Sequence, residues 1–402
     1  MHRLPGPIDP VFHNVAGGVV AVNCTHFRGD RPCAAGKQGL CANACSDFAA
    51  MGRRVLVIKL GALGDVIRTA ALLPGIRDAY SPCQITWVTR SEGARMLSGH
   101  PLIERVLPLT VETMAHLLHE EFDLCLSLDK EPGPAGLAMR VRAAERRGIG
   151  LTRFGTPIPL NPECEPYFTL GLDDALKFRG NRWTYPELIY AAVGLPYRGQ
   201  RYTLHPPAAA HRAAERIVAR ARLEPGTRIV GLNTGAGGVF ANKTWPPDKF
   251  IQLARSLRQR DGVAVGLLGG PREAALNREI AACAPGAIDL GCDHDEPTFA
   301  SLVSRCAVLV TGDTMALHVG VAMEVPVVAI FGPTCEQEID LFGRGEKIVT
   351  SVACAPCYRR ECNLSPTCMD DISLTRVAEA VERWLPARRA ARVTLPLVEA
   401  AR

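Results

Sequence analysis

Two successive series of short, strongly apolar segments dominate this sequence and constrain its fold more than any other feature. The first series begins at 53–60 with RRVLVIKL and continues through QITWVT, IERVLPL, FDLCLSL and RRGIGL, with helix-compatible residues between them. Short runs rich in β-branched residues are typical of strands buried on both faces of a parallel sheet. Their alternation with helices predicts a doubly wound α/β sheet. Pro74 is expected to end or kink the first helix.

The same pattern restarts after the prolines at 206–207. Its strands are RIVGLNTGA, GVAVGLLGG, AVLVTGD and PVVAIFG, with helices expected at about 246–260, 271–283, 297–306 and 315–323. Two such sheets in tandem imply a cleft faced by the loops at the carboxyl ends of both sets of strands. We therefore expect two Rossmann-like domains at 51–205 and 206–385, a small appendage at 1–50 and a tail at 386–402.

Composition excludes several classes of protein. Hydrophobic residues make up 47% of the chain and charged residues 22%, as in soluble globular proteins. The net charge of +5 is small, and no basic stripe alternates with aromatic residues, so nucleic acid is not an expected partner. No apolar run reaches the length of a membrane span, and the N-terminus is a poor signal peptide, so we expect the cytoplasm.

Basic residues give the only sign of a membrane or an acidic partner. The tail carries Arg388, Arg389, Arg392 and Arg402, which could rest on anionic lipid or simply be solvated. Arg140, Arg142, Arg146 and Arg147 in the first half could meet an acidic glycolipid, although a solvated arginine face is the default. Peripheral membrane contact is therefore one of two interpretations of these arginines, and solvated surface residues are the other.

The segment KLGALGDVIRT at 59–69 joins the first strand to the first helix. Gly61 and Gly64 permit a tight turn, and free N–H groups at the helix start favour an anion, as in a phosphate-binding loop. Asp65 nevertheless stands at this helix start. It is either a helix cap, for which aspartate is well suited, or a general base that takes a proton from a hydroxyl.

Two loops of the second half carry groups suited to a nucleotide sugar. The loop NTGAGGVFANK combines Thr234, several glycines and Lys243, so its amides and its lysine could bind a diphosphate. The next loop ends at Glu273, which could hold a sugar hydroxyl. A flexible loop with a surface lysine and an exposed helical glutamate are the structural alternatives.

The segment TGDTMALHVGVAMEVPVVAIFGPT is the most informative of the second half. Asp313 and Thr314 lie where a strand ends and a helix starts, and His318 follows one turn later. A helix that opens in this way, with free N–H groups, suits a nucleotide diphosphate. Taken alone, His318 fits a hydrogen-bonded core histidine better than a ligand-binding residue.

Several of these segments, in this order over 53–385, resemble glycosyltransferase family 9, the bacterial ADP-heptose:lipopolysaccharide heptosyltransferases. The resemblance rests on VLVIKLGALGDVIRTAALLPGIR, NKTWP, TGDTMALHVGVAMEVPVVAIFGPT and CAPCYRRECNLSPTCMDDIS. It implies a GT-B architecture, with the acceptor on the N-terminal domain and the nucleotide sugar on the C-terminal one. It also implies inverting, metal-independent transfer of a heptose from ADP-heptose to a lipopolysaccharide core-type acceptor, at the inner face of the membrane.

The resemblance assigns roles to individual residues. Asp65 matches the catalytic carboxylate, Lys243 matches the lysine at the donor diphosphate, and Asp313, Thr314 and His318 match the donor-binding motif. Met315 stands where the family usually has glycine, which puts the donor's identity in doubt. Another nucleotide sugar, or a protein or small-molecule acceptor, is therefore an alternative. A non-catalytic assembly or redox-responsive protein on the same scaffold is a second one.

Two cysteine clusters flank the predicted domains. Cys24, Cys33, Cys41 and Cys45 precede the first strand, and Cys354, Cys357, Cys362 and Cys368 follow the last one. The second set has the spacing of a zinc or iron site. For the first set we consider a structural metal, disulfides, which seldom persist in the cytoplasm, and reactive thiols. The clusters could hold separate metals or share one, and transfer itself would need no cofactor.

Overall fold

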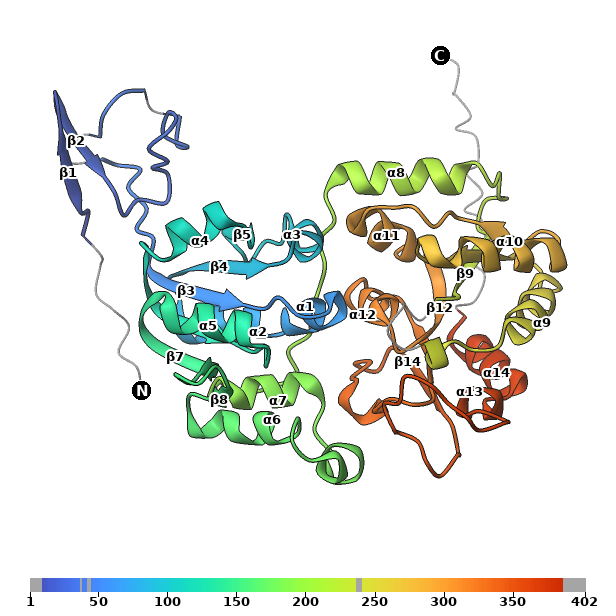
Figure 1. The fold of residues 1–402 in the computed structure, drawn as a ribbon. Helices are drawn as coiled ribbons and strands as arrows, with labels where there is room; N and C mark the ends of the chain where they lie inside the picture. Colours follow the sequence, from blue (N-terminus) through green and yellow to red (C-terminus); the bar gives the residue numbers. More distant parts are fainter. Residues whose placement is uncertain (1–8, 37, 42–44, 236–240, 386–402) are drawn as a thin grey trace, which may run out of the picture.

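The computed structural model describes residues 9–36, 38–41, 45–235 and 241–385. It contains two six-stranded sheets, one in each half of the chain. Figure 1 shows the two halves side by side. The Arg-rich tail and residues 236–240 of the predicted donor loop lie outside the described residues.

The first sheet has the strand order β5-β4-β3-β6-β7-β8, in which all neighbours are parallel except the last pair. Its strands are β3 (Arg53–Ile58), β4 (Cys83–Thr89), β5 (Arg105–Pro108), β6 (Glu121–Ser127), β7 (Arg142–Leu151) and β8 (Pro157–Pro159). Its helices are α1 (Leu63–Thr69), α2 (Leu72–Tyr80), α3 (Ser91–Leu97), α4 (Val111–Leu117), α5 (Pro132–Arg140), α6 (Glu165–Thr169) and α7 (Tyr185–Ala192), with single turns η1 (Pro162–Cys164) and η2 (Leu176–Gly180).

The second sheet repeats this order as β11-β10-β9-β12-β13-β14, and all its neighbours are parallel. Its strands are β9 (Arg228–Asn233), β10 (Val263–Leu268), β11 (Ile288–Asp289), β12 (Cys306–Gly312), β13 (Val327–Phe331) and β14 (Gly345–Val349). The helices are α8 (Ala208–Ala219), α9 (Pro247–Arg258), α10 (Ala274–Cys283), α11 (Glu296–Val303), α12 (Met315–Ala322), α13 (Cys368–Asp371) and α14 (Leu374–Trp384), with turns η3 (Ala241–Lys243), η4 (Pro271–Glu273) and η5 (Glu336–Glu338).

Both sheets therefore have the doubly wound order. The first strand lies at the centre, the next two strands extend the sheet to one side, and the later strands extend it to the other side. The reversal lies between β3 and β6 in the first sheet and between β9 and β12 in the second. Ligands of such sheets bind beyond the carboxyl ends of the strands at this reversal. The loops after β3, β6, β9 and β12 are thus the ones that position a site.

The helices begin and end where local chemistry dictates. The helical segment is interrupted between α1 and α2, just ahead of Pro74. Pro74 lies in the first turn of α2, where its missing N–H costs no hydrogen bond. Helix α7 begins at Tyr185 because the Glu187 carboxylate accepts a hydrogen bond from the backbone N–H of Thr184. The sequence did not predict the short edge strands β8, β11 and β14.

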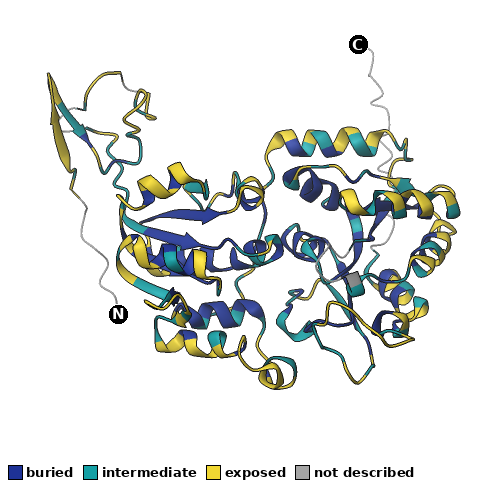
Figure 2. Ribbon diagram, in the orientation of Figure 1, coloured by how far each residue is buried: buried dark blue, intermediate teal, exposed yellow. Residues whose placement is uncertain are grey.

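The helices α1 and α12 pack together where the two halves meet. Figure 2 shows the central strands of both sheets as buried. One core cluster runs from Val55 and Ile67 in the first half to Leu317 and Val319 on α12. The Arg95 guanidinium also pairs with the Glu296 carboxylate across the halves, with Nε–Oε2 at 2.7 Å. A shared core cluster and an ion pair therefore hold the halves together.

The N-terminal residues form a separate hairpin of β1 (Phe12–Val15) and β2 (Gly18–Ala21), followed by loops. Figure 1 shows this segment projecting from the end of the first sheet. Within the described residues, no helix has both the length and the apolar character needed to cross a bilayer.

Candidate active site

Asp65 lies in the first turn of α1, directly after β3, and is not a helix cap. The N-cap of α1 is Ala62, and no side chain caps that end of the helix. The Asp65 carboxylate instead points to Arg68 one turn along, with 2.9 Å between Arg68 Nη2 and Asp65 Oδ1. Its side chain keeps 36% of its surface exposed. The carboxylate is therefore available to a molecule in the cleft.

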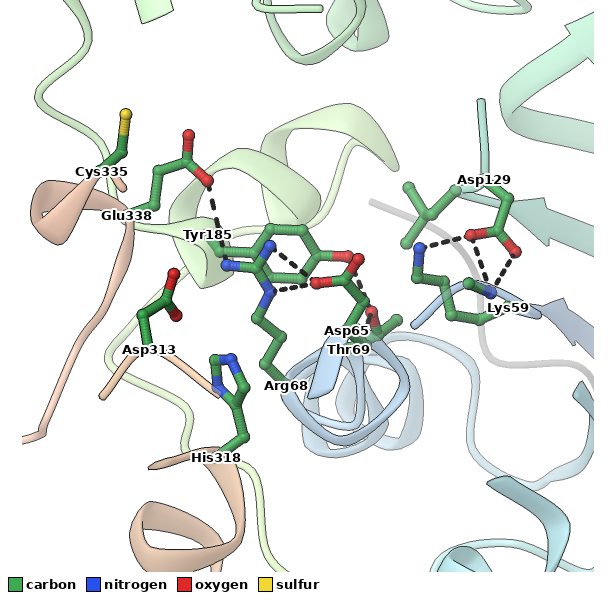
Figure 3. Close-up of polar contacts among 12 residues, drawn as sticks. Lys59, Asp65, Arg68, Thr69, Asp129, Tyr185, Asp313, His318, Cys335 and Glu338 are labelled. Atoms are coloured by element: carbon green, nitrogen blue, oxygen red, sulfur yellow. Dashed lines mark hydrogen bonds and ion pairs between the residues drawn. The ribbon is translucent and has the colours of Figure 1, made fainter. Parts of the chain in front are cut away.

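Arg68 connects this carboxylate to the second half of the chain (Figure 3). Its guanidinium carbon lies 3.7 Å from the ring centre of Tyr185, and its Nη1 lies 3.9 Å from Glu338 Oε2. Asp313 and His318 face it from the opposite side. Arg68 is thus the central cation between the two halves.

The charges around Asp65 determine its ionisation. Burial raises the pKa of the carboxyl group, but the positive charges of Arg68 and Lys59 outweigh burial and hold the pKa below its usual value. His318 is almost fully buried, and burial together with the charge of Arg68 lowers its pKa to about 4. Near neutral pH, Asp65 is a carboxylate and His318 is a neutral imidazole.

A polar pocket of about 210 Å³ opens beside Asp65. It is formed mainly by the loops after β3 and β6 and by the segment before α7. Its charged lining residues are Lys59, Asp65, Arg68, Asp129, Lys130, Glu131, Lys177 and Glu338. A ligand of this pocket would be polar and rich in hydroxyl or anionic groups.

A buried ion pair fixes the floor of this pocket. The Asp129 carboxylate accepts hydrogen bonds from Lys59 Nζ and from the backbone N–H groups of Leu60 and Gly61. A Cβ on Gly61 would lie 2.8 Å from Asp129 Oδ1, so glycine is needed for this close approach. Asp129 therefore positions the loop that carries Asp65.

The start of α12 faces this region from the second half. Thr314 is the N-cap, and its hydroxyl accepts a hydrogen bond from Ala316 N. Asp313 precedes it and pairs with Lys243, with 3.3 Å between Nζ and Oδ2. Burial raises the pKa of Asp313, but the charge of Lys243 outweighs it and the pKa is lowered. The structure thus brings together all the residues of the predicted donor motif and Lys243.

His318 packs against α1. A Cβ on Gly64 would lie 2.6 Å from His318 Cδ2, and Tyr202 OH lies 3.4 Å from His318 Nδ1. Gly64 therefore permits the close contact between the two halves. This packing role differs from the phosphate-binding role that the sequence suggested. That phosphate role stays a prediction for Gly61 and Gly64.

A second pocket, of about 350 Å³, lies between Leu63 of α1 and the loops of the second sheet. Its lining includes Asn233, Glu273, Thr314 and Met315. The Glu273 carboxylate also accepts a hydrogen bond from Gly270 N. Predicted donor residues and an unpredicted asparagine therefore share one pocket next to α1.

Thr234 does not take the place that the sequence suggested. It is almost fully buried, and its hydroxyl donates to Asn277 Oδ1 at 2.6 Å. The preceding residue, Asn233, lines the pocket instead. Alternate residues of an extended chain point to opposite sides, so a shift of one residue exchanges pocket and core.

Comparison with known proteins finds glycosyltransferases that are similar to this chain. The model of glycosyltransferase family 9 (heptosyltransferase) matches residues 183–367. Lipopolysaccharide heptosyltransferase 1 of Pseudomonas aeruginosa is 25% identical over 344 residues, which cover 78% of this chain and 88% of that protein. The chain is a glycosyltransferase similar to the heptosyltransferases of family 9.

Solved structures agree on the fold of this glycosyltransferase. The glycosyl transferase family 9 from Veillonella parvula superposes with a TM-score of 0.67 at 18% identity, over 83% of this chain and 97% of that one. The E. coli ADP-heptose lps heptosyltransferase II gives 0.63 at 18% identity, over 83% and 98%. The parallel α/β sheets of this chain are those of heptosyltransferase structures.

The sequence did not point to Lys59, Arg68, Asp129 or Glu338 as site residues of this glycosyltransferase. Only Arg68 carried a signal, because it lies three residues from Asp65 on one helix face. The arginines proposed for an acidic glycolipid serve other purposes in part. Arg146 donates to the backbone oxygens of Ala138, Val141 and Ala143, and Arg147 donates to that of Val193.

The two cysteine clusters of this glycosyltransferase lie on opposite sides of the molecule (Figure 1), so they do not share an ion. Cys24, Cys33, Cys41 and Cys45 line one cavity of about 70 Å³ together with Phe27 and Phe48. Burial and the nearby Cys357, Cys362 and Cys354 raise the pKa of Cys368 to about 11. Across the described ranges, however, no three His, Cys, Asp or Glu side chains are grouped to hold a metal ion. The metal role of both clusters stays a prediction.

Proposed function

We propose that this protein transfers heptose from ADP-heptose to a hydroxyl of a lipopolysaccharide core-type acceptor, with inversion and without a metal. The observation that carries the proposal is that α1 contributes to two pockets, with Asp65 in the wall of the polar pocket and Leu63, two residues earlier, in the wall of the second pocket. The polar pocket beside it is formed mainly by the first half, and the pocket at Thr314 is formed mainly by the second.

Asp65 is suited to act as the base. Its carboxylate is ionised near neutral pH, lies in the wall of the polar pocket and is oriented by Arg68. A general base must reach the proton that it removes and must be unprotonated at the working pH. A hydroxyl bound in the polar pocket would give its proton to Asp65 as its oxygen attacks the anomeric carbon. A single displacement of this kind inverts that carbon.

The second half is suited to hold the donor and to stabilise the departing diphosphate. The N–H groups at the start of α12 provide positive charge at the pocket that Thr314 lines. Lys243 would add its charge from outside the pocket lining, where it pairs with Asp313, the residue before Thr314. Glu273 and Asn233 offer polar atoms for a ribose or sugar hydroxyl. The name of the E. coli structure, ADP-heptose lps heptosyltransferase II, supports ADP-heptose as the donor.

Product analysis with several nucleotide sugars tests the proposal. The purified protein is incubated with heptose-deficient lipopolysaccharide and with ADP-heptose or other nucleotide sugars, and mass spectrometry follows nucleotide release and acceptor mass. We expect ADP release and heptose addition only with ADP-heptose, unchanged by a chelator, and an inverted anomeric centre by NMR. Transfer only from another nucleotide sugar would show that ADP-heptose is not the donor. Met315 in the pocket lining is a specific reason to include other nucleotide sugars in the assay.

A further inference from the structure

An apolar groove adjoins the polar pocket on the first half of the chain. It has a volume of about 610 Å³, within the roughly 300–1,000 Å³ typical of small-molecule sites. Its walls come from α6, the turn η2 and the residues that precede α7, at the bottom of the first half in Figure 1. The apolar side chains of its lining include Pro162, Pro166, Leu170, Leu176, Trp183 and Leu188.

The groove and the polar pocket share part of their walls. Leu170 and Leu188 line both of them, so the wall of one becomes the wall of the other. Charge is concentrated on the pocket side of this junction, where Lys130 and Lys177 lie. One bound molecule could therefore place a polar, hydroxyl-bearing part at Asp65 and an apolar part in the groove.

Two large apolar side chains of the groove are exposed to solvent. Trp183 is 46% exposed and Leu176 is 39% exposed, while both line the groove. The backbone around Trp183 is fixed independently of its ring, because Asn181 Oδ1 accepts from Trp183 N and Asn181 Nδ2 donates to Trp183 O. An amphipathic side chain held in this way suits a site where a ligand's apolar chain meets a polar head.

We propose that this groove binds the apolar chain of a glycolipid acceptor while its sugar occupies the polar pocket at Asp65. The inference rests on the proposed function, because it takes the acceptor hydroxyl to meet Asp65. The wall that groove and pocket share favours the acceptor's own chain over an unrelated ligand. Recognition would then extend beyond the sugar, and loss of the chain would weaken acceptor binding.

A comparison of two acceptors tests the groove. Heptose-deficient lipopolysaccharide and the same material after alkaline deacylation are assayed with the wild type and with Leu176→Ser and Trp183→Ala. We expect the wild type to favour the acylated acceptor by about tenfold in kcat/KM, which corresponds to ~1.4 kcal/mol. The two groove variants should bring this ratio toward one.

Leu172→Ser is the matched control. Leu172 lies four residues before Leu176, is 71% exposed and does not line the groove. It should keep the wild-type ratio. Equal kcat/KM for both acceptors in the wild type, or an unchanged ratio in both groove variants, overturns the proposal. If the groove variants lose vesicle binding but keep the ratio, the surface contacts the bilayer and the proposal is equally wrong.

A binding measurement separates this proposal from the proposed function. Octyl glucoside below its critical micelle concentration is titrated into the wild type and Leu176→Ser, and tryptophan emission is followed. We expect a saturable change that Leu176→Ser weakens and that is absent from Trp183→Ala. The absence of any saturable change in the wild type contradicts the groove. A wild type that binds this probe but transfers no heptose would overturn the proposed function alone.

Discussion

The guanidinium of Arg68 lies 2.9 Å from the carboxylate of Asp65, one turn away on the same short helix. The same guanidinium stacks on Tyr185 and approaches Glu338 of the second half. The ionisation of the proposed base therefore depends on a cation whose own position depends on both halves of the chain. This dependence can be measured.

Removing the Arg68 charge should make Asp65 harder to ionise. In Arg68→Gln, the largest positive charge that opposes burial is lost and Lys59 remains, so the pKa of Asp65 rises. A base with a depressed pKa keeps its charge as the pH falls, so the acid limb of kcat/KM should move to higher pH in the variant. We also expect about a tenfold loss of kcat near neutral pH, or ~1.4 kcal/mol.

The pH profile of kcat/KM checks this prediction against two further variants. Arg68→Lys keeps the charge and should keep an acid limb close to that of the wild type. Arg95→Gln removes a different contact between the halves and should leave the limb unchanged. An acid limb that does not move in Arg68→Gln shows that Arg68 does not control Asp65.

Gly64 should tolerate no side chain, because its Cβ would lie 2.6 Å from the His318 ring. Gly64→Ala must push α1 and α12 apart, and overpacking of this kind costs roughly 1–3 kcal/mol. We expect a lower Tm and a lower kcat/KM. Gly133→Ala is the control, since a Cβ there meets nothing within 4 Å and the helix α5 gains propensity. A similar Tm for both variants would contradict the packing role of Gly64.

The charge of Lys130 should give acceptor binding an alkaline limit. Burial, with a smaller effect of Lys177, lowers the pKa of Lys130 to about 8. Its positive charge in the polar pocket is present below this pH and is lost above it. For an anionic acceptor, KM should therefore rise between about pH 7 and pH 9, as the charge that binds it disappears.

Acceptor KM measured against pH, with Lys130→Arg alongside, decides this point. Arginine keeps its charge throughout this range, so the rise in KM should disappear in that variant. The same rise in wild type and Lys130→Arg would mean that another group titrates.

The sequence predicted the sheets well because their strands are buried on both faces. The pattern of β3, β4, β9 and β10 can be read from apolar residues alone. The edge strand β14 carries Glu346 and Lys347 and is half-buried, so no apolar run marked it. Edge pairing depends on a neighbour that the local sequence does not show.

The sequence predicted those site residues that belong to a local motif. It missed the residues that only the folded structure brings near the site. Asp65, Asp313 and Thr314 lie at the carboxyl ends of strands and could be placed from the strand pattern. Asp129 follows β6, and its carboxylate reaches a loop some seventy residues earlier in the chain. Thr234 was assigned to the pocket, whereas its hydroxyl turns to Asn277 in the core. No local pattern distinguishes these outcomes.

The metal interpretation of the N-terminal cysteines predicts zinc or iron in the purified protein, at about one ion per four thiolates. Four cysteines line one small cavity there, in a segment too short to bury a core of its own. Elemental analysis and thiol titration of the same sample measure this, with Cys24→Ser compared with Cys125→Ser, a buried strand residue of the first sheet. Protein without zinc or iron, whose thiols all react, would contradict it.

The role of Asp65 is tested most directly by a single-turnover assay of Asp65→Asn with ADP-heptose and heptose-deficient lipopolysaccharide, together with calorimetric binding of ADP-heptose. Asparagine keeps the size of the side chain but cannot accept the proton. We predict that donor binding persists while heptose transfer falls by at least about a hundredfold, within the range of general base catalysis. Transfer at the wild-type rate by a variant that binds the donor normally would contradict it.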